Sequence, residues 1–110
     1  MLKVIARGNL TTDVTVREVK FGNDVRKVCD FGFACNDGYG DLKQTTYLRV
    51  HAWRGMADVA KTYLAKGRSA LICGPITLNT YTDANGETRS SIELRADEIE
   101  FLDGAKRETA

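Results

Sequence analysis

Hydrophobic and polar residues alternate along most of the chain, a pattern with a period of two that predicts β-strands. The alternation is clearest in residues 44–55. Small and apolar side chains take one set of alternate positions, Thr46, Leu48, Val50 and Ala52. The other set is Tyr47, Arg49, His51 and Trp53. Because successive side chains of a strand point to opposite faces, this segment predicts one core face and one face of rings and cations.

The ring-bearing face has two interpretations. An aromatic ring stacks on any unpaired base and a guanidinium reaches the phosphate beside it, so Tyr47, Arg49 and Trp53 suit single-stranded nucleic acid. Aromatic residues are also common in strands, and Tyr, Trp and Arg are enriched in subunit interfaces. The strand alone favours neither interpretation.

Other extended patterns surround this strand. Residues 2–7 and 14–19 fit either one long bent strand or two short ones, and residues 25–35 place Cys29, Phe31, Phe33 and Cys35 on a core face. Residues 68–76 predict a further strand that Gly74-Pro75 interrupts, because proline lacks the amide donor of the ladder. Residues 77–82 continue it, and Asn85-Gly86 predicts a hairpin to residues 88–96.

One segment has a helical period instead. Apolar residues recur at Met56, Val59, Ala60, Tyr63 and Leu64. Lys66-Gly67 predicts the end of this helix and Tyr63 is expected to pack in the core. The order of elements predicts an all-β fold with one helix: an OB-fold, which is a five-stranded Greek-key barrel with a helix between strands 3 and 4. An SH3-like barrel, the alternative, lacks so long a helix there.

Composition narrows the function. The chain has 110 residues, with 16 Lys and Arg against 15 Asp and Glu, so attraction to phosphate must come from local placement of charge. His51 is the only histidine and the acidic residues are scattered, which disfavours an enzyme or a metal site. Three cysteines without a C-x-x-C pair predict buried free thiols. We expect a cytoplasmic protein with no cofactor and no membrane segment.

Several motifs, taken in order, resemble the bacterial single-stranded DNA-binding protein family between Lys3 and Leu102. They are Val4-Ile5-x-x-Gly8-Asn9-Leu10 with Asp13 and Arg17, Phe31-x-Phe33-Ala34-x-Asn36, Thr46-Tyr47-x-Arg49-Val50, Ala57-x-Val59-Ala60-x-x-Tyr63-Leu64-x-Lys66-Gly67, Gly74-x-Ile76, Tyr81-Thr82-Asp83-x-x-Gly86 and Glu93-Leu94-x-Ala96-x-x-Ile99. Each motif is weak alone, and their order and near-ungapped spacing make the set specific.

The resemblance implies an OB-fold that assembles as a homotetramer, with a dimer as the alternative, and wraps single-stranded DNA without reading its sequence. The family's stacking positions fall on Tyr39, Tyr47, Trp53 and Tyr81. Its cationic positions fall on Arg49, Lys3 and Lys66. Where relatives carry basic residues before Tyr81, this chain has Thr77-Leu78-Asn79-Thr80. The candidates to compensate are Arg7, Arg26, Lys27, Lys43 and Arg54, of which Arg54 is included in the predicted DNA-binding set.

The domain is expected to span residues 1–102, followed by a short polar, disordered tail at 103–110. Family members commonly continue through a linker to an acidic tip that recruits repair enzymes. If Ala110 is the natural end rather than the end of a shortened chain, we expect such recruitment to be absent. The predicted function is binding and protection of single-stranded DNA in replication, recombination or repair. The alternative is a primosomal-type OB module that binds protein partners or RNA through the same face.

Overall fold

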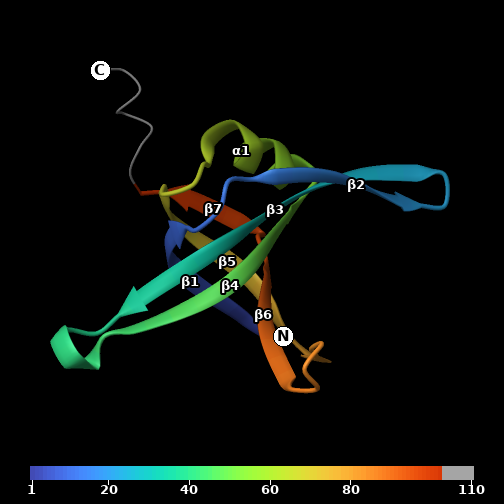
Figure 1. The fold of residues 1–110 in the computed structure, drawn as a ribbon. Helices are drawn as coiled ribbons and strands as arrows, with labels where there is room; N and C mark the ends of the chain where they lie inside the picture. Colours follow the sequence, from blue (N-terminus) through green and yellow to red (C-terminus); the bar gives the residue numbers. More distant parts are fainter. Residues whose placement is uncertain (103–110) are drawn as a thin grey trace.

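The structure is a computed structural model that describes residues 1–102, in which strands form a closed barrel with one α-helix beside it (Figure 1). The strands are β1 Lys3–Leu10, β2 Thr15–Phe21, β3 Asp24–Asp37, β4 Gln44–Trp53, β5 Ser69–Thr82, β6 Thr88–Arg95 and β7 Glu98–Phe101. The helices are α1, Gly55–Tyr63, and the short 3₁₀ helix η1, Gly40–Leu42. The prediction for residues 103–110 lies outside the described residues.

Five strands close into a ring in the order β1, β3, β4, β6, β5 and back to β1. All contacts in the ring are antiparallel except that between β4 and β6, which run parallel from the Leu48–Ile92 pair to the His51–Arg95 pair. The prediction of a five-stranded OB barrel with a helix between the third and fourth ring strands is therefore confirmed. The N-terminal extended segment forms two separate strands, β1 and β2. Strand β2 lies outside the ring and pairs with β3 as an antiparallel hairpin.

The strand that contains Gly74-Pro75 is continuous, contrary to the predicted interruption. Pro75 pairs with Lys3 at the end of the β1 ladder, and Ile76 then pairs with Leu94 of β6. Proline therefore stands where β5 changes partners, a position that needs no amide donor. Gly74 allows the crossing: a Cβ there would lie 1.8 Å from the Arg95 carbonyl oxygen.

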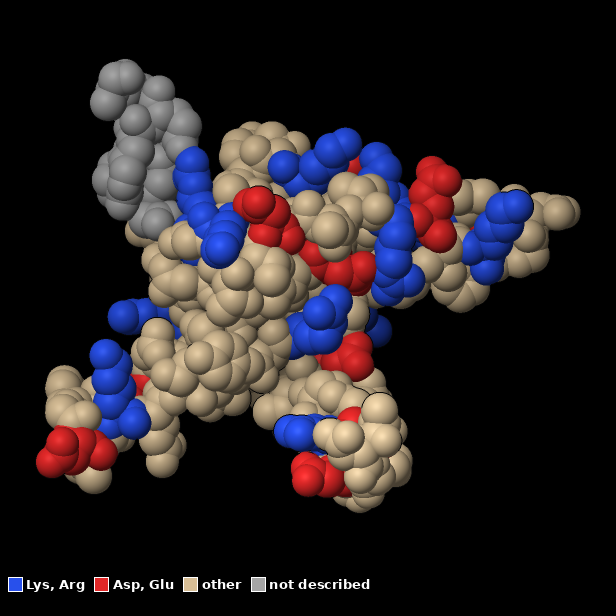
Figure 2. Space-filling view, in the orientation of Figure 1, with Lys and Arg blue, Asp and Glu red and all other residues tan. Residues whose placement is uncertain are grey.

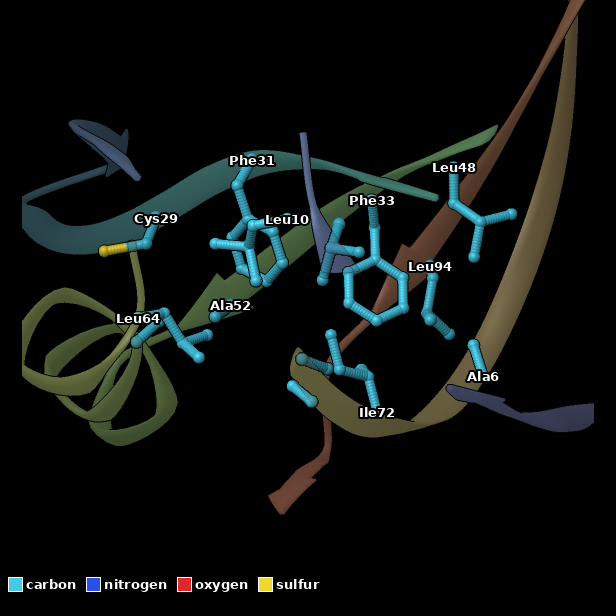
Figure 3. Packing of buried hydrophobic residues seen from close by; sticks show 14 of the residues in the cluster. Ala6, Leu10, Cys29, Phe31, Phe33, Leu48, Ala52, Leu64, Ile72 and Leu94 are labelled. Carbon is cyan, nitrogen blue, oxygen red and sulfur yellow. The ribbon is translucent and has the colours of Figure 1, made fainter. Parts of the chain in front are cut away.

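The core fills the ring with side chains from alternate positions of its strands (Figure 3). Phe31 and Phe33 of β3 are buried with ring centroids 6.3 Å apart, close to edge-on at 70°. Leu48, Val50 and Ala52 of β4 are buried as predicted. Their alternation forces the intervening β4 residues onto the outer surface of the barrel.

Helix α1 covers one end of the barrel through Ala57 and Ala60. The Cys29 thiol donates a hydrogen bond to the Ala57 carbonyl at 3.1 Å. The helix ends at Tyr63, earlier than Lys66-Gly67, because the next turns bond to other elements: the Gly67 amide donates to the Leu10 carbonyl at 2.9 Å. Tyr63 is half-exposed and packs on Phe101, with ring centroids 5.3 Å apart, so its predicted core position is wrong.

Three hairpins project from the barrel, β2–β3, β3–β4 and β5–β6 (Figure 1). Gly22, at φ 63°, opens the two-residue turn between β2 and β3, as glycine does at the first position of a type II′ turn. The predicted turn at Asn85-Gly86 is present, with Gly86 at φ 81° and its amide donating to the Asp83 carbonyl at 3.0 Å. Within residues 1–102 no helix is long and apolar enough to cross a membrane.

Candidate nucleic-acid interface

Strand β4 pairs with β3 on one side and with β6 on the other. Its outer face carries the predicted row of aromatic and basic residues. Tyr47 is 68% exposed and Arg49 is exposed, whereas His51 and Trp53 are half-buried. We call these four residues the β4 row. Tyr47 and Trp53 are six residues apart, roughly 20 Å along an extended strand.

Tyr47 owes its exposure to its neighbour. In the antiparallel ladder between β3 and β4 it stands opposite Ala34, whose methyl group is too small to cover a phenol ring. Paired residues share a face of the sheet, so a larger residue at this position would pack against the ring. The sequence thus leaves the ring face of Tyr47 open in the centre of a sheet.

The middle of the β4 row is a charge network rather than an open cation. The Nδ1 atom of His51 lies 2.5 Å from Asp30 Oδ1 on β3, and its Nε2 atom lies 2.5 Å from Glu93 Oε1 on β6. Arg17 Nε of β2 donates to Asp30 Oδ2 at 2.5 Å, and Asn79 of β5 donates to Glu93. Both histidine contacts are hydrogen bonds only when both ring nitrogens carry protons.

The network keeps two acidic groups ionised on a face proposed to meet phosphate. Burial alone would raise the pKa of Asp30, but hydrogen bonds from Arg17 and His51 outweigh it and hold that pKa below its usual value. Hydrogen bonds from His51 and Asn79 lower the pKa of Glu93. Arg17, His51 and Asn79 therefore hold both carboxylates within the network.

Trp53, at the end of β4, lies between two shallow grooves that share it and Arg95. One is lined by His51, Trp53, Pro75, Thr77, Asn79, Glu93 and Arg95. The other is lined by Phe21, Arg26, Trp53, Arg54 and Arg95. Trp53 therefore borders both grooves, and Arg54, which follows it, lines the second groove.

The other two predicted stacking residues lie on hairpins. Tyr39 is 89% exposed on the β3–β4 connection, where it directly precedes η1. Tyr81 is half-exposed on β5, opposite Arg89 of β6. The structure brings these rings to the outer surface without bringing them into contact with Tyr47 or Trp53.

The predicted lysines lie at the margins. Lys3 pairs with Pro75, which lines the groove beside His51 and Trp53, and its ammonium is 3.6 Å from Asp97. Lys66 lies on the connection from α1 to β5, where its amide donates to Asp13 Oδ1 at 2.9 Å. Lys3 is therefore beside the candidate interface. No contact described for residues 1–102 joins Lys66 to the β4 row, and its role stays a prediction.

Sequence reasoning missed Phe21, Arg95 and the partners of His51. Phe21 is the last residue of β2, and only the pairing of β2 with β3 carries its ring to 6.0 Å from Trp53. Arg95 pairs with His51 across the parallel β4–β6 contact. The signal that could have found Phe21 is a large apolar residue beside a Gly-Asn turn, where burial in the barrel is impossible.

Charge is interspersed over the surface rather than gathered. Figure 2 shows lysine and arginine side chains scattered among acidic ones on the face toward the viewer.

Among residues 1–102 no cluster of His, Cys, Asp and Glu could hold a metal ion. Cys29 is buried as a free thiol, whereas Cys35 and Cys73 are only half-buried, a partial correction of the predicted burial. The chemistry available on this surface is stacking and ion pairing.

Comparison with known proteins agrees with this geometry. Residues 1–102 match the model of the single-strand binding protein family. The chain belongs to that family. The resemblance inferred from the motifs is thereby confirmed, and so is the expectation that the chain is not an enzyme, because proteins of this family are non-enzymatic DNA-binding proteins.

Individual relatives extend the match over the barrel. "Single-stranded DNA-binding protein 2" of Chlorobaculum tepidum is 30% identical over 109 residues, which cover 94% of this chain and 72% of that protein. The single-stranded DNA-binding protein of Wolinella succinogenes is 35% identical over 108 residues, 92% of this chain and 64% of its own length. The crystal structure of a small single-stranded DNA-binding protein from Streptomyces coelicolor matches with a TM-score of 0.78 at 25% identity, covering 96% of both chains.

Proposed function

We propose that this single-strand binding family member binds single-stranded DNA without sequence preference. Unpaired bases stack on Tyr47 and Trp53 of the β4 row, and on Tyr39 and Tyr81 at its flanks, while cations beside these rings contact the phosphates. The observation that carries the proposal is the exposure of Tyr47. Its ring is 68% exposed on the outer surface of β4, where it contributes nothing to the core. The names of the relatives support the same ligand.

The neutral overall charge shapes this proposal. A chain of formal net charge +1 has little long-range attraction for a polyanion, and the network around His51 also pairs the Arg17 guanidinium with Asp30. Arg49 remains exposed on β4 and is the phosphate contact of the row. We therefore expect binding with a shallow salt dependence, in which stacking supplies a larger share of the free energy than ion pairing.

The cellular role and the assembly are part of the proposal. Binding of this kind covers and protects single strands exposed in replication, recombination or repair. We infer a homotetramer, as the family resemblance implies. Large apolar residues at the surface support association, namely Leu2, Ile5 and Leu78, each more than 60% exposed. Light scattering distinguishes a tetramer of the 12.2 kDa chain from a dimer.

The experiment is anisotropy of labelled oligo(dT) titrated with protein at several salt concentrations. Tyr47→Ala is expected to weaken binding to all base compositions equally, by about tenfold, since stacking contributes roughly 1–3 kcal/mol per base. Arg49→Ala is expected to reduce the slope of log affinity against log salt by about one. Tyr63→Ala is the matched control, because it removes an equally large ring, half-exposed on α1, from outside the β4 row.

A loss that depends on base identity after Tyr47→Ala would contradict unspecific stacking. An unchanged slope after Arg49→Ala would mean that this guanidinium does not contact phosphate. Titration of oligo(U) beside oligo(dT) tests the RNA alternative: stacking does not distinguish the sugars, so a clear preference for RNA would point to a contact with the 2′-hydroxyl.

A further inference from the structure

The groove between the β2–β3 hairpin and the end of β4 combines rings and cations at high density. Its lining is Phe21, Arg26, Trp53, Arg54 and Arg95, and the three arginines pair with carboxylates outside this lining, Arg26 and Arg54 with Asp24 and Arg95 with Asp97. Three guanidinium groups around two rings are the elements of a nucleotide site: flat surfaces for a base and bidentate donors for a phosphate. Of these residues, the predicted site contained only Trp53 and Arg54.

The two rings contact each other at the groove. Phe21 and Trp53 have centroids 6.0 Å apart and planes tilted by 53°. The Arg26 guanidinium carbon lies over one face of Phe21, 4.2 Å from the ring centre, so a base can stack on this ring only from the opposite face. Phe21 is 45% exposed at the end of β2 and lies outside the hydrophobic core cluster.

A carboxylate beside the groove marks where an anion fits. Asp24 Oδ2 accepts from Arg26 Nε at 3.0 Å and lies 3.6 Å from Arg54 Nη2. One oxygen shared by two guanidinium groups has the arrangement in which arginines hold a phosphate oxygen. The Asp24 side chain is 56% exposed, and exposed ion pairs of this kind are weak enough for a stronger anion to replace.

Arg54 is held in the groove at a conformational cost. Its φ of 53° and ψ of −118° lie in a region that favours glycine. Among residues 1–102, Arg54 is the only residue other than glycine that has a positive φ. Strained backbone of this kind persists where the surrounding structure enforces it and is common at ligand sites. An arginine therefore follows Trp53 at a position whose backbone conformation favours glycine.

We propose that this groove is a further nucleotide subsite for single-stranded DNA, in which a base stacks against Phe21 and Trp53 and its phosphate replaces Asp24 as the partner of Arg26 and Arg54. The subsite rests on the proposed function and extends the path of the strand from the β4 row onto the β2–β3 hairpin. Asp24 is then a built-in competitor that weakens binding.

The test is the affinity of oligo(dT) of graded length, from roughly 4 to 16 nucleotides, the span of OB-fold site sizes. Phe21→Ala is expected to weaken binding of the longer oligonucleotides about tenfold, with little effect on the shortest. Asp24→Asn is expected to strengthen it, by up to about fivefold, because the phosphate no longer displaces an ion pair. Arg54→Gly is expected to weaken binding while relieving the backbone, so loss of folding does not account for the result.

Two controls match these variants. Val16→Ala removes apolar surface, about half-exposed, from β2, and Glu100→Gln removes an exposed carboxylate from β7, and neither residue lines the adjoining pocket that contains Asp24. Neither residue lines the groove, so neither is expected to change affinity. Melting temperatures check that all variants are folded.

The outcomes separate this subsite from the function on which it rests. If the parent protein binds oligo(dT) and neither Phe21→Ala nor Asp24→Asn changes its affinity, the subsite is wrong and the proposed function stands. Weaker binding by Asp24→Asn would overturn the role of Asp24 as a competitor. If the parent protein binds no oligo(dT) at low salt, the proposed function fails and the subsite fails with it.

Discussion

The residues of the outer face are explained by what stands opposite them. Tyr47 is open because Ala34 is small, and His51 is enclosed because Asp30 and Glu93 are within hydrogen-bond distance on either side. The alternation of residues 44–55 predicted which side chains share this face. It could not predict that His51 contacts two carboxylates, because these lie 21 and 42 positions away in sequence.

Asp30 gives a prediction for stability against pH. Its pKa is lower in the folded chain than in the unfolded one, so the unfolded state takes up the proton first as pH falls. The stabilisation by Arg17 and His51 is present at neutral pH and is lost as pH falls below about 4. Asp30→Asn is expected to cost about 1–3 kcal/mol at pH 7, because the buried Asp30 carboxylate is the acceptor of the Arg17 hydrogen bonds and a partner of His51, and to flatten the acid limb of the stability curve.

Urea unfolding at a series of pH values measures both effects. Asp41→Asn, at an exposed position in η1, is the control and is expected to leave stability within about 0.5 kcal/mol of the parent chain. An acid limb as steep in Asp30→Asn as in the parent would show that the network does not control acid stability.

At the scale of elements, the strands were predictable and their partners were not. The period of two located most of the barrel strands, because apolar and polar residues alternate along a strand that is buried on one face only. Pairing is a long-range property: the 6.0 Å contact of Phe21 with Trp53 follows from the β2–β3 register. The end of α1 escaped prediction for a related reason, because hydrogen bonds to Leu10 and Asp13 compete with another helical turn.

Closure of the ring depends on the crossing at Gly74, and this gives a prediction. Gly74→Ala is expected to destabilise the fold by about 1–3 kcal/mol, because the new methyl group meets the Arg95 carbonyl and the backbone must shift. Gly55→Ala, the control at the start of α1, has no atom within 4 Å of the added Cβ and is expected to be neutral or slightly stabilising. Denaturant unfolding compares the two, and equal stability of both variants would mean that β5 does not cross β6 as closely as described.

The whole molecule is a small barrel that presents rings on an outer wall and on projecting hairpins. Composition predicted neither feature, because a formal charge of +1 and an ordinary aromatic content describe many small domains. The motifs from Lys3 to Leu102 predicted the family, and the comparisons confirm it. Which surface residues gather around Trp53 became visible only when the hairpins were placed.

The most direct measurement is the emission of Trp53, the only tryptophan of the chain, during titration with oligo(dT) at low salt. The account predicts quenching as a base stacks on the indole, with saturation at a defined ratio of nucleotides to protein, and no quenching by duplex DNA, whose bases are already paired and stacked. Emission that stays unchanged while oligo(dT) binds would contradict the placement of single-stranded DNA on this face of the barrel.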